Sequence, residues 1–170
     1  MKNGILGGLG KTIMKLNPIS VIIIDDVASY FNDHMLSIAS SKGNITFERY
    51  AKCDATLLKS LVSNPRDILI MDIKGTVTSD IGKDGFDVAR HVYSNSPTFV
   101  AITSAHKYHL KNQNNYGDYI ISERLMTPID FAEEMNNMID IYLKKKVRVY
   151  KKLFFKVGKY LYKYGLNTSP

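Results

Sequence analysis

The feature that most constrains the fold is a series of short apolar runs, several of which end in acidic or hydroxyl residues. Five such runs cover residues 20–25, 45–50, 68–71, 99–102 and 119–121. The first ends in Asp25 and Asp26, the third is followed by Asp72, and the fourth by Thr103. Short β-branched runs bounded by polar residues are typical of strands that are buried on both faces of a parallel sheet.

Segments with helical periodicity lie between these runs. Apolar residues at spacings of three and four cover residues 27–38, 57–62 and 86–93, with a weaker pattern at 106–116. Asp54 is placed to cap the second helix, and Thr127 followed by Pro128 marks the start of a long last helix. The alternation predicts an α/β three-layer sandwich around a five-stranded parallel sheet.

Charge divides the chain unevenly. Residues 144–170 contain nine lysines and arginines and no acid, a charge of +9, so the remaining 143 residues carry 14 basic and 16 acidic side chains, a charge of −2. The basicity therefore belongs to the C-terminal segment. We expect a leader at residues 1–18, one α/β domain at 19–143 and a basic amphipathic extension at 144–170.

Composition also indicates the compartment. Cys53 is the single cysteine, which excludes an intramolecular disulfide and fits a reducing compartment, so the cytoplasm is expected. No apolar run approaches the roughly 20 residues that span a bilayer. The first 15 residues lack the pattern of a signal peptide.

Acidic residues at strand ends predict a cation site. In open α/β sheets, ligands bind beyond the carboxyl ends of the strands, where the strand order reverses. A flavodoxin-like order places the first and third strands side by side, so that Asp25, Asp26 and Asp72 converge. Gathered carboxylates repel one another unless a divalent cation binds them, and Mg²⁺ prefers such hard oxygen ligands. An aspartate in this setting can attack a phosphoryl group, with Thr103 binding one of its oxygens.

The arrangement resembles the receiver domain of bacterial two-component response regulators, over roughly residues 19–143. The resemblance is carried by residues 22–26 (IIIDD), 69–73 (LIMDI), 84–89 (DGFDVA), 101–105 (AITSA) and 117–121 (GDYII). It implies a signalling protein that is not an enzyme and that accepts a phosphoryl group on Asp72 from a histidine kinase or phosphotransfer protein. Mg²⁺ would be held by Asp25, Asp26, Asp72 and the backbone carbonyl of Lys74, and Thr103 would sense the phosphoryl group.

Two features depart from the family's pattern. The resemblance makes Tyr119 the switch aromatic, and three residues later the family has a lysine where this chain has Ser122. The loop at residues 74–85 is also several residues longer than usual. These departures leave open a second reading, in which a receiver fold acts without phosphorylation, through its basic extension.

A second resemblance begins at the same aspartate. Residues 72–78 (DIKGTVT) look like the first motif of haloacid-dehalogenase-type phosphatases, in which Asp72 would also form a phosphoaspartate. That family needs an acid at the position of Lys74 and places the motif on the first strand, so this reading ranks below the other two.

The basic extension has the pattern of an amphipathic helix. Its apolar stripe consists of Leu143, Val147, Tyr150, Phe154, Val157, Leu161 and Tyr164, spaced alternately by four and three. Such a helix can form a homodimer, bind an anionic membrane surface or contact nucleic-acid phosphates. It can also pack on its own domain. We expect self-association as the slightly favoured use.

Overall fold

The computed structural model describes residues 17–104, 117–121 and 125–163, with side chains in the last range described as far as Lys146. Five parallel strands form one sheet in the order β2-β1-β3-β4-β5. Their bounds are β1 Ile19–Ile24, β2 Ile45–Tyr50, β3 Ile68–Asp72, β4 Phe99–Thr103 and β5 Tyr119–Ile121. The predicted five-stranded parallel sheet and its flavodoxin-like order are confirmed.

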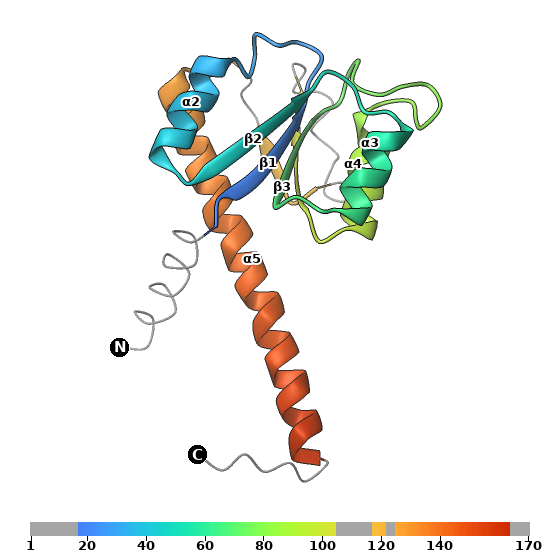
Figure 1. Ribbon diagram of the computed structural model, residues 1–170, viewed down its shortest axis with the longest axis vertical. Coiled ribbons are helices and arrows are strands. Elements are labelled where there is room, and N and C mark those ends of the chain that lie inside the picture. Colours follow the sequence, from blue (N-terminus) through green and yellow to red (C-terminus); the bar gives the residue numbers. More distant parts are fainter. Residues whose placement is uncertain (1–16, 105–116, 122–124, 164–170) are drawn as a thin grey trace. The chain divides into compact units, whose positions relative to one another are not determined.

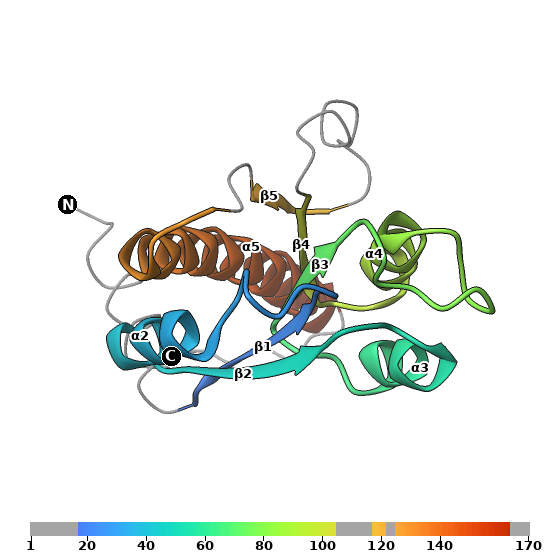
Figure 2. The same ribbon diagram turned by 90° about the horizontal axis from the view of Figure 1, so that it is seen from above.

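The helices cover both faces of the sheet. They are α2 Asp33–Lys42, α3 Ala55–Ser63, α4 Gly85–Asn95 and α5 Pro128–Lys163. α3 and α4 lie against one face, and α2 lies on the other together with the first turns of α5 (Figures 1 and 2). On that second face, the ring of Phe131 from α5 lies 5.5 Å from that of Phe31 and 6.4 Å from that of Phe47. The predicted three-layer arrangement is therefore present.

The chain divides into two compact units, residues 1–136 and 137–170. The first contains the whole sheet and the first turns of α5. The second contains the remainder of α5, which continues as an uninterrupted helix as far as Lys163. No helix in the described residues is long and apolar enough to cross a membrane.

Short polar side chains cap the helices near the positions that the sequence predicts. The carboxylate of Asp54 accepts a hydrogen bond from the Leu57 amide at 2.8 Å, which satisfies a free donor in the first turn of α3. At the start of α5, the Thr127 hydroxyl accepts one from the Asp130 amide at 3.2 Å, while the Asp130 carboxylate accepts one from the Thr127 amide. The predicted caps at Asp54 and Thr127, with Pro128 as the first helical residue, are confirmed.

The first helix begins later than the periodicity predicts. The prediction of a helix that starts at Val27 is wrong, because α2 begins at Asp33. It is capped by Asn32, whose side chain accepts a hydrogen bond from the Met35 amide. The preceding residues form turns instead, since the Asp25 carboxylate accepts from the Val27 amide at 2.8 Å. Phe31 belongs to this turn segment and is buried, so its position fits the spacing of a helical face although the segment is not a helix.

Alternation along the central strands sends side chains to opposite faces of the sheet. The α3–α4 side buries Ile22, Ile24, Leu69, Met71, Val100 and Ile102 in one cluster with side chains of those helices. Strand residues of opposite parity therefore face α2, among them Ile70 and Asp72 of β3. Asp72 is consequently the last residue of a buried row, at the carboxyl end of a central strand.

Some predictions fall on residues outside the described ranges. These are the leader up to residue 16, the weak helical pattern at 106–116, Ser122 and the last seven residues.

Candidate metal and phosphoryl site

Three carboxylates converge at the carboxyl ends of β1 and β3. Asp25, Asp26 and Asp72 each offer an oxygen, and these oxygens lie within 4.8 Å of one another. The strands are neighbours with Ile24 beside Met71, so the residues that follow them emerge at the same edge. Asp72 is 1% exposed, Asp25 is buried and Asp26 is exposed, so one side of the group opens to solvent. The predicted convergence of these acids is observed.

The chemistry of this donor set fits a hard divalent cation. Three carboxylates at this spacing repel one another in their ionised form, and a cation among them offsets that repulsion. Because Asp26 is exposed, waters can complete an octahedral shell on the open side, as Mg²⁺ requires. Lys74, which the sequence assigns to the site through its carbonyl, lies two residues after Asp72 with an exposed side chain.

A buried hydroxyl lies beside Asp72. Thr103 ends β4 in register with Asp72, and both residues are on the same face of the sheet. Thr103 is fully buried, and its Oγ1 has no hydrogen-bond partner among the residues that the structure describes. Leaving a buried hydroxyl unsatisfied costs about 1–3 kcal/mol, so a group that accepts a hydrogen bond from Thr103 would be stabilised beside Asp72.

The long loop after β3 is held against the chain segment that follows β2. The Cys53 amide donates to the Thr76 carbonyl at 2.7 Å, and the Thr78 amide donates back to the Cys53 carbonyl at 3.1 Å. Val77 forms a parallel bridge with Cys53, and the Thr78 hydroxyl also donates to the Cys53 carbonyl. The unusually long loop is therefore held in place by a short parallel pairing between residues 76–78 and Cys53.

Gly75 brings this loop against the acidic group. Its φ is +73°, a left-handed conformation that favours glycine, and a Cβ at this position would lie 2.1 Å from Asp26 Oδ2. Only a residue without a side chain permits this approach. The sequence shows Gly75 as one of three glycines in the loop, but gives no sign of which one contacts an acid.

The thiol at the base of this loop is inert. Cys53 is fully buried, and burial together with the charges of Asp54 and Asp80 raises the pKa of its thiol to about 12. It therefore stays protonated and unreactive near neutral pH. Its contribution is structural, because its backbone groups hold the loop in place.

A cleft opens beside Asp25 and Asp26. It has a volume of about 190 Å³ and is bordered by residues of β1, the turn that follows it and the end of β2. Arg49 lines this cleft and was not predicted as a site residue. Its guanidinium donates to the Phe31 carbonyl and pairs with Asp33 at 2.8 Å. The sequence could have indicated Arg49 as a site residue, because it lies near the carboxyl end of β2, the strand that pairs with β1.

Tyr119, the expected switch aromatic, lies at the start of β5 and is partly buried. Its hydroxyl donates to Glu134 Oε1 of α5 at 3.0 Å. Burial, followed by this hydrogen bond, raises the pKa of Tyr119 above its usual value, so the phenol stays neutral and keeps its proton to donate. The contact links the edge strand of the sheet to the first turns of α5.

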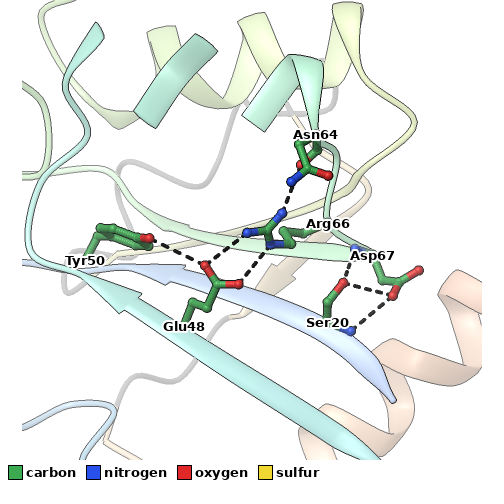
Figure 3. Close-up of polar contacts among 6 residues, drawn as sticks. All are labelled: Ser20, Glu48, Tyr50, Asn64, Arg66 and Asp67. Atoms are coloured by element: carbon green, nitrogen blue, oxygen red, sulfur yellow. Dashed lines mark hydrogen bonds and ion pairs between the residues drawn. The ribbon is translucent and has the colours of Figure 1, made fainter. Parts of the chain in front are cut away.

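A contrasting set of acids lies around the start of β3 (Figure 3). The Asp67 carboxylate accepts from both the amide and the hydroxyl of Ser20, at 3.0 Å each, and the Asp67 amide donates back to that hydroxyl. Arg66 donates to both carboxylate oxygens of Glu48, at 3.0 and 3.2 Å, and to the Asn64 carbonyl. Each of these carboxylates is matched by donors of the chain itself, so this set is structural.

Several solved structures that are similar to this chain are receiver domains of response regulators. The chain is similar to the response regulator domain of CheB from Thermotoga maritima, with 17% identity, a TM-score of 0.55, and coverage of 75% of this chain and 98% of that one. It is also similar to the REC domain of the response regulator AraT from Geobacillus stearothermophilus, with 16% identity, a TM-score of 0.56, and coverage of 76% of this chain and 96% of that one. For the signal receiver domain of the putative response regulator NarL from Mycobacterium tuberculosis, the identity is 21%, the TM-score is 0.51, and the coverage is 71% of this chain and 95% of that one.

These likenesses establish the class of fold, which is that of the response regulator receiver domain. No protein-family model matches the sequence, and no curated protein sequence matches it. At identities of 21% and below in the three structures above, the likeness extends to the fold alone. Function must therefore be argued from the site.

Proposed function

We propose that this chain is a receiver-type signalling protein that accepts a phosphoryl group on Asp72 with the help of Mg²⁺. The observation that carries the proposal is the meeting of three carboxylates, from the ends of β1 and β3, with a buried and unsatisfied Thr103 hydroxyl in register with Asp72. A structural cap or turn does not require acids from two strands and a hydroxyl from a third at one edge of a sheet.

In this proposal Asp72 is the nucleophile. One of its carboxylate oxygens forms a bond to phosphorus, while the bond from phosphorus to the donor's imidazole nitrogen breaks and its electron pair remains on the imidazole. The product is an acyl phosphate on Asp72. The Thr103 hydroxyl donates a hydrogen bond to a phosphoryl oxygen, which satisfies a hydroxyl that has no partner among the described residues.

Asp25 and Asp26, with Asp72 and the Lys74 carbonyl, are the groups that would hold the cation. When bound, Mg²⁺ offsets the negative charge that gathers on the phosphoryl oxygens and the carboxylates. Gly75 keeps the loop close to Asp26 and so fixes one wall of the site. The phosphoryl donor we propose is a histidine kinase or phosphotransfer protein, and the setting is the cytoplasm, where a single thiol remains reduced.

The change at Asp72 would be transmitted through β4 and β5 to α5. Thr103 pairs with Ile121 in register, and the hydroxyl of Tyr119 on the same strand is bonded to Glu134. Movement of Thr103 towards a phosphoryl oxygen would therefore reach α5 through two directly connected elements.

The second candidate is a receiver fold that acts without phosphorylation. Ser122 favours it, because the sequence has no lysine at the position where related domains bind the phosphoryl group. In that case the acidic group would only bind cations, and the protein would act through its surface and its basic extension.

Intact-mass measurement after incubation with acetyl phosphate separates the two candidates. We expect the mass of one phosphoryl group to be added in the presence of Mg²⁺, and no addition when Mg²⁺ is removed by a chelator. The variant Asp72→Asn should show no addition, whereas Asp80→Asn, which removes an exposed acid from the loop after β3, should behave like the unmodified chain. Absence of any adduct on the unmodified chain would favour the second candidate.

A further inference from the structure

The C-terminal half of α5 combines a continuous helix with an unusual concentration of charge. α5 runs without interruption from Pro128 to Lys163. Between Lys144 and Lys163 it contains nine lysines and arginines and no acid. The first of these, Lys144, Lys145 and Lys146, are exposed. Because this stretch contains no acid, it has a high net positive charge, which attracts solvent anions or an anionic partner.

The charge is segregated around the helix. A residue turns the helix by about 100°, so the residues from Leu143 to Leu161 that are spaced alternately by four and three fall on one stripe. Eight of the nine basic residues fall within an arc of about 140° on the other side. The exception is Lys146, whose amine donates to the Tyr142 hydroxyl and lies 5.0 Å from the centre of that ring.

The positions of the lysines disfavour the self-association that we expected from the apolar stripe alone. Read as a coiled coil, the stripe would occupy the a and d positions, and the flanking e and g positions would include Lys144, Lys146 and Lys151. Coiled coils are stabilised when opposite charges face each other across these positions. Here no acid is available anywhere in the segment, so a homodimer would bring lysines together and repel itself.

The apolar stripe decides between the two classes of anionic partner. Binding to nucleic-acid phosphates depends on cationic side chains and does not use an apolar stripe, which here contains Tyr150, Phe154 and Leu161. A lipid headgroup region accepts both properties, because the apolar stripe enters the boundary of the acyl chains while lysines contact anionic headgroups. Tyrosine is also enriched at this boundary.

We propose that residues 143–163 form an interfacial helix that binds a membrane surface rich in anionic phospholipid and lies in its plane. The helix does not span the bilayer, in keeping with the lack of a spanning helix among the described residues. This inference does not depend on phosphorylation of Asp72, and its test reads membrane binding alone.

The test is cosedimentation of the full chain with vesicles. One set is phosphatidylcholine alone and the other contains phosphatidylglycerol as well. We expect binding to the anionic vesicles to be at least about tenfold stronger, and to weaken as salt is raised. The double variant Lys151→Glu/Lys152→Glu should reduce this binding at least about tenfold. Its matched control, Lys52→Glu/Lys59→Glu, makes the same change in net charge at exposed sites of the α/β unit and should change it less than about twofold.

A second pair of variants tests the apolar stripe at constant charge. Phe154 belongs to the stripe, while its neighbour Phe155 falls within the basic arc. We expect Phe154→Ser to weaken vesicle binding about tenfold and Phe155→Ser to have a clearly smaller effect. Circular dichroism checks that both variants keep the helical content of the unmodified chain.

Three results would overturn the inference. The first is binding to duplex DNA without binding to anionic vesicles, which assigns the charge to nucleic acid. The second is a concentration-dependent oligomer that Phe154→Ser dissociates, again without vesicle binding, which assigns the stripe to a second copy. The third is equal vesicle binding by the Lys151→Glu/Lys152→Glu variant and its matched control.

Discussion

Acidic side chains lie at both ends of β3, but the two groups are built in opposite ways. Around the start of the strand, Asp67 accepts hydrogen bonds from Ser20, and Glu48 accepts hydrogen bonds from Arg66 (Figure 3). After the strand, Asp25, Asp26 and Asp72 converge within 4.8 Å of one another. The first group stabilises the fold by joining segments distant in sequence. The second concentrates like charge, which costs stability and agrees with our proposal that a cation binds there.

The comparison implies that removing an acid has opposite consequences in the two groups. Removal from the first group should lower stability and leave ligand binding unchanged. Removal of the exposed Asp26 from the second should lower cation affinity and leave stability unchanged or slightly raised.

Asp26→Asn should lower Mg²⁺ affinity roughly 100-fold, because one charged ligand is lost at nearly constant shape. Isothermal titration calorimetry measures the change directly. In the absence of Mg²⁺, the melting temperature should not fall, since repulsion among the three carboxylates is relieved. Mg²⁺ binding equal to that of the unmodified chain would remove Asp26 from the proposed site.

Asp67→Ala should lower the free energy of unfolding by about 2 kcal/mol, because the amide and hydroxyl of Ser20 lose a charged acceptor. Urea denaturation at neutral pH provides the measurement. The affinity for Mg²⁺ should stay within about twofold of the original value. A large loss of affinity with little loss of stability would reverse the comparison.

Gly75→Ala should lower Mg²⁺ affinity about tenfold, since the added Cβ must displace either the loop or the Asp26 carboxylate. The matched control is Gly82→Ala, in the same loop, where a Cβ would meet the Asp87 side chain instead. Equal effects of both variants in the same titration would mean that the contact between Gly75 and Asp26 has no special part in Mg²⁺ binding.

Glu48→Gln should lower stability by less than about 1 kcal/mol, because its ion pair with Arg66 is partly exposed, at 43% and 23% for the two side chains. The loss should shrink further in high salt. Asp33→Asn, which breaks the pair with Arg49 at a carboxylate that is 90% exposed, should cost less still. Urea denaturation at two salt concentrations ranks the two pairs.

Local patterns predicted most of the fold. The apolar runs, the caps at Asp54 and Thr127, and the alternation of strands and helices all act over a few residues, so they are visible in the sequence. The segment 27–32 was misread because Phe31 and Tyr30 occupy positions that fit helical spacing. There the Asp25 side chain competes for the Val27 amide and sets the chain into a turn before Asn32 can start the helix.

The order of residues along the chain is enough to predict that acids follow two buried strands, and the expected strand order predicts that they meet. The surroundings of these acids depend on the packing of the elements: the pairing of Cys53 with the loop at residues 76–78, the approach of Gly75 to Asp26, and the position of Arg49 beside the cleft. Strand and helix signals depend on neighbours along the chain. These contacts join segments that lie on different elements, so they depend on how the elements pack and leave no periodic trace in the sequence.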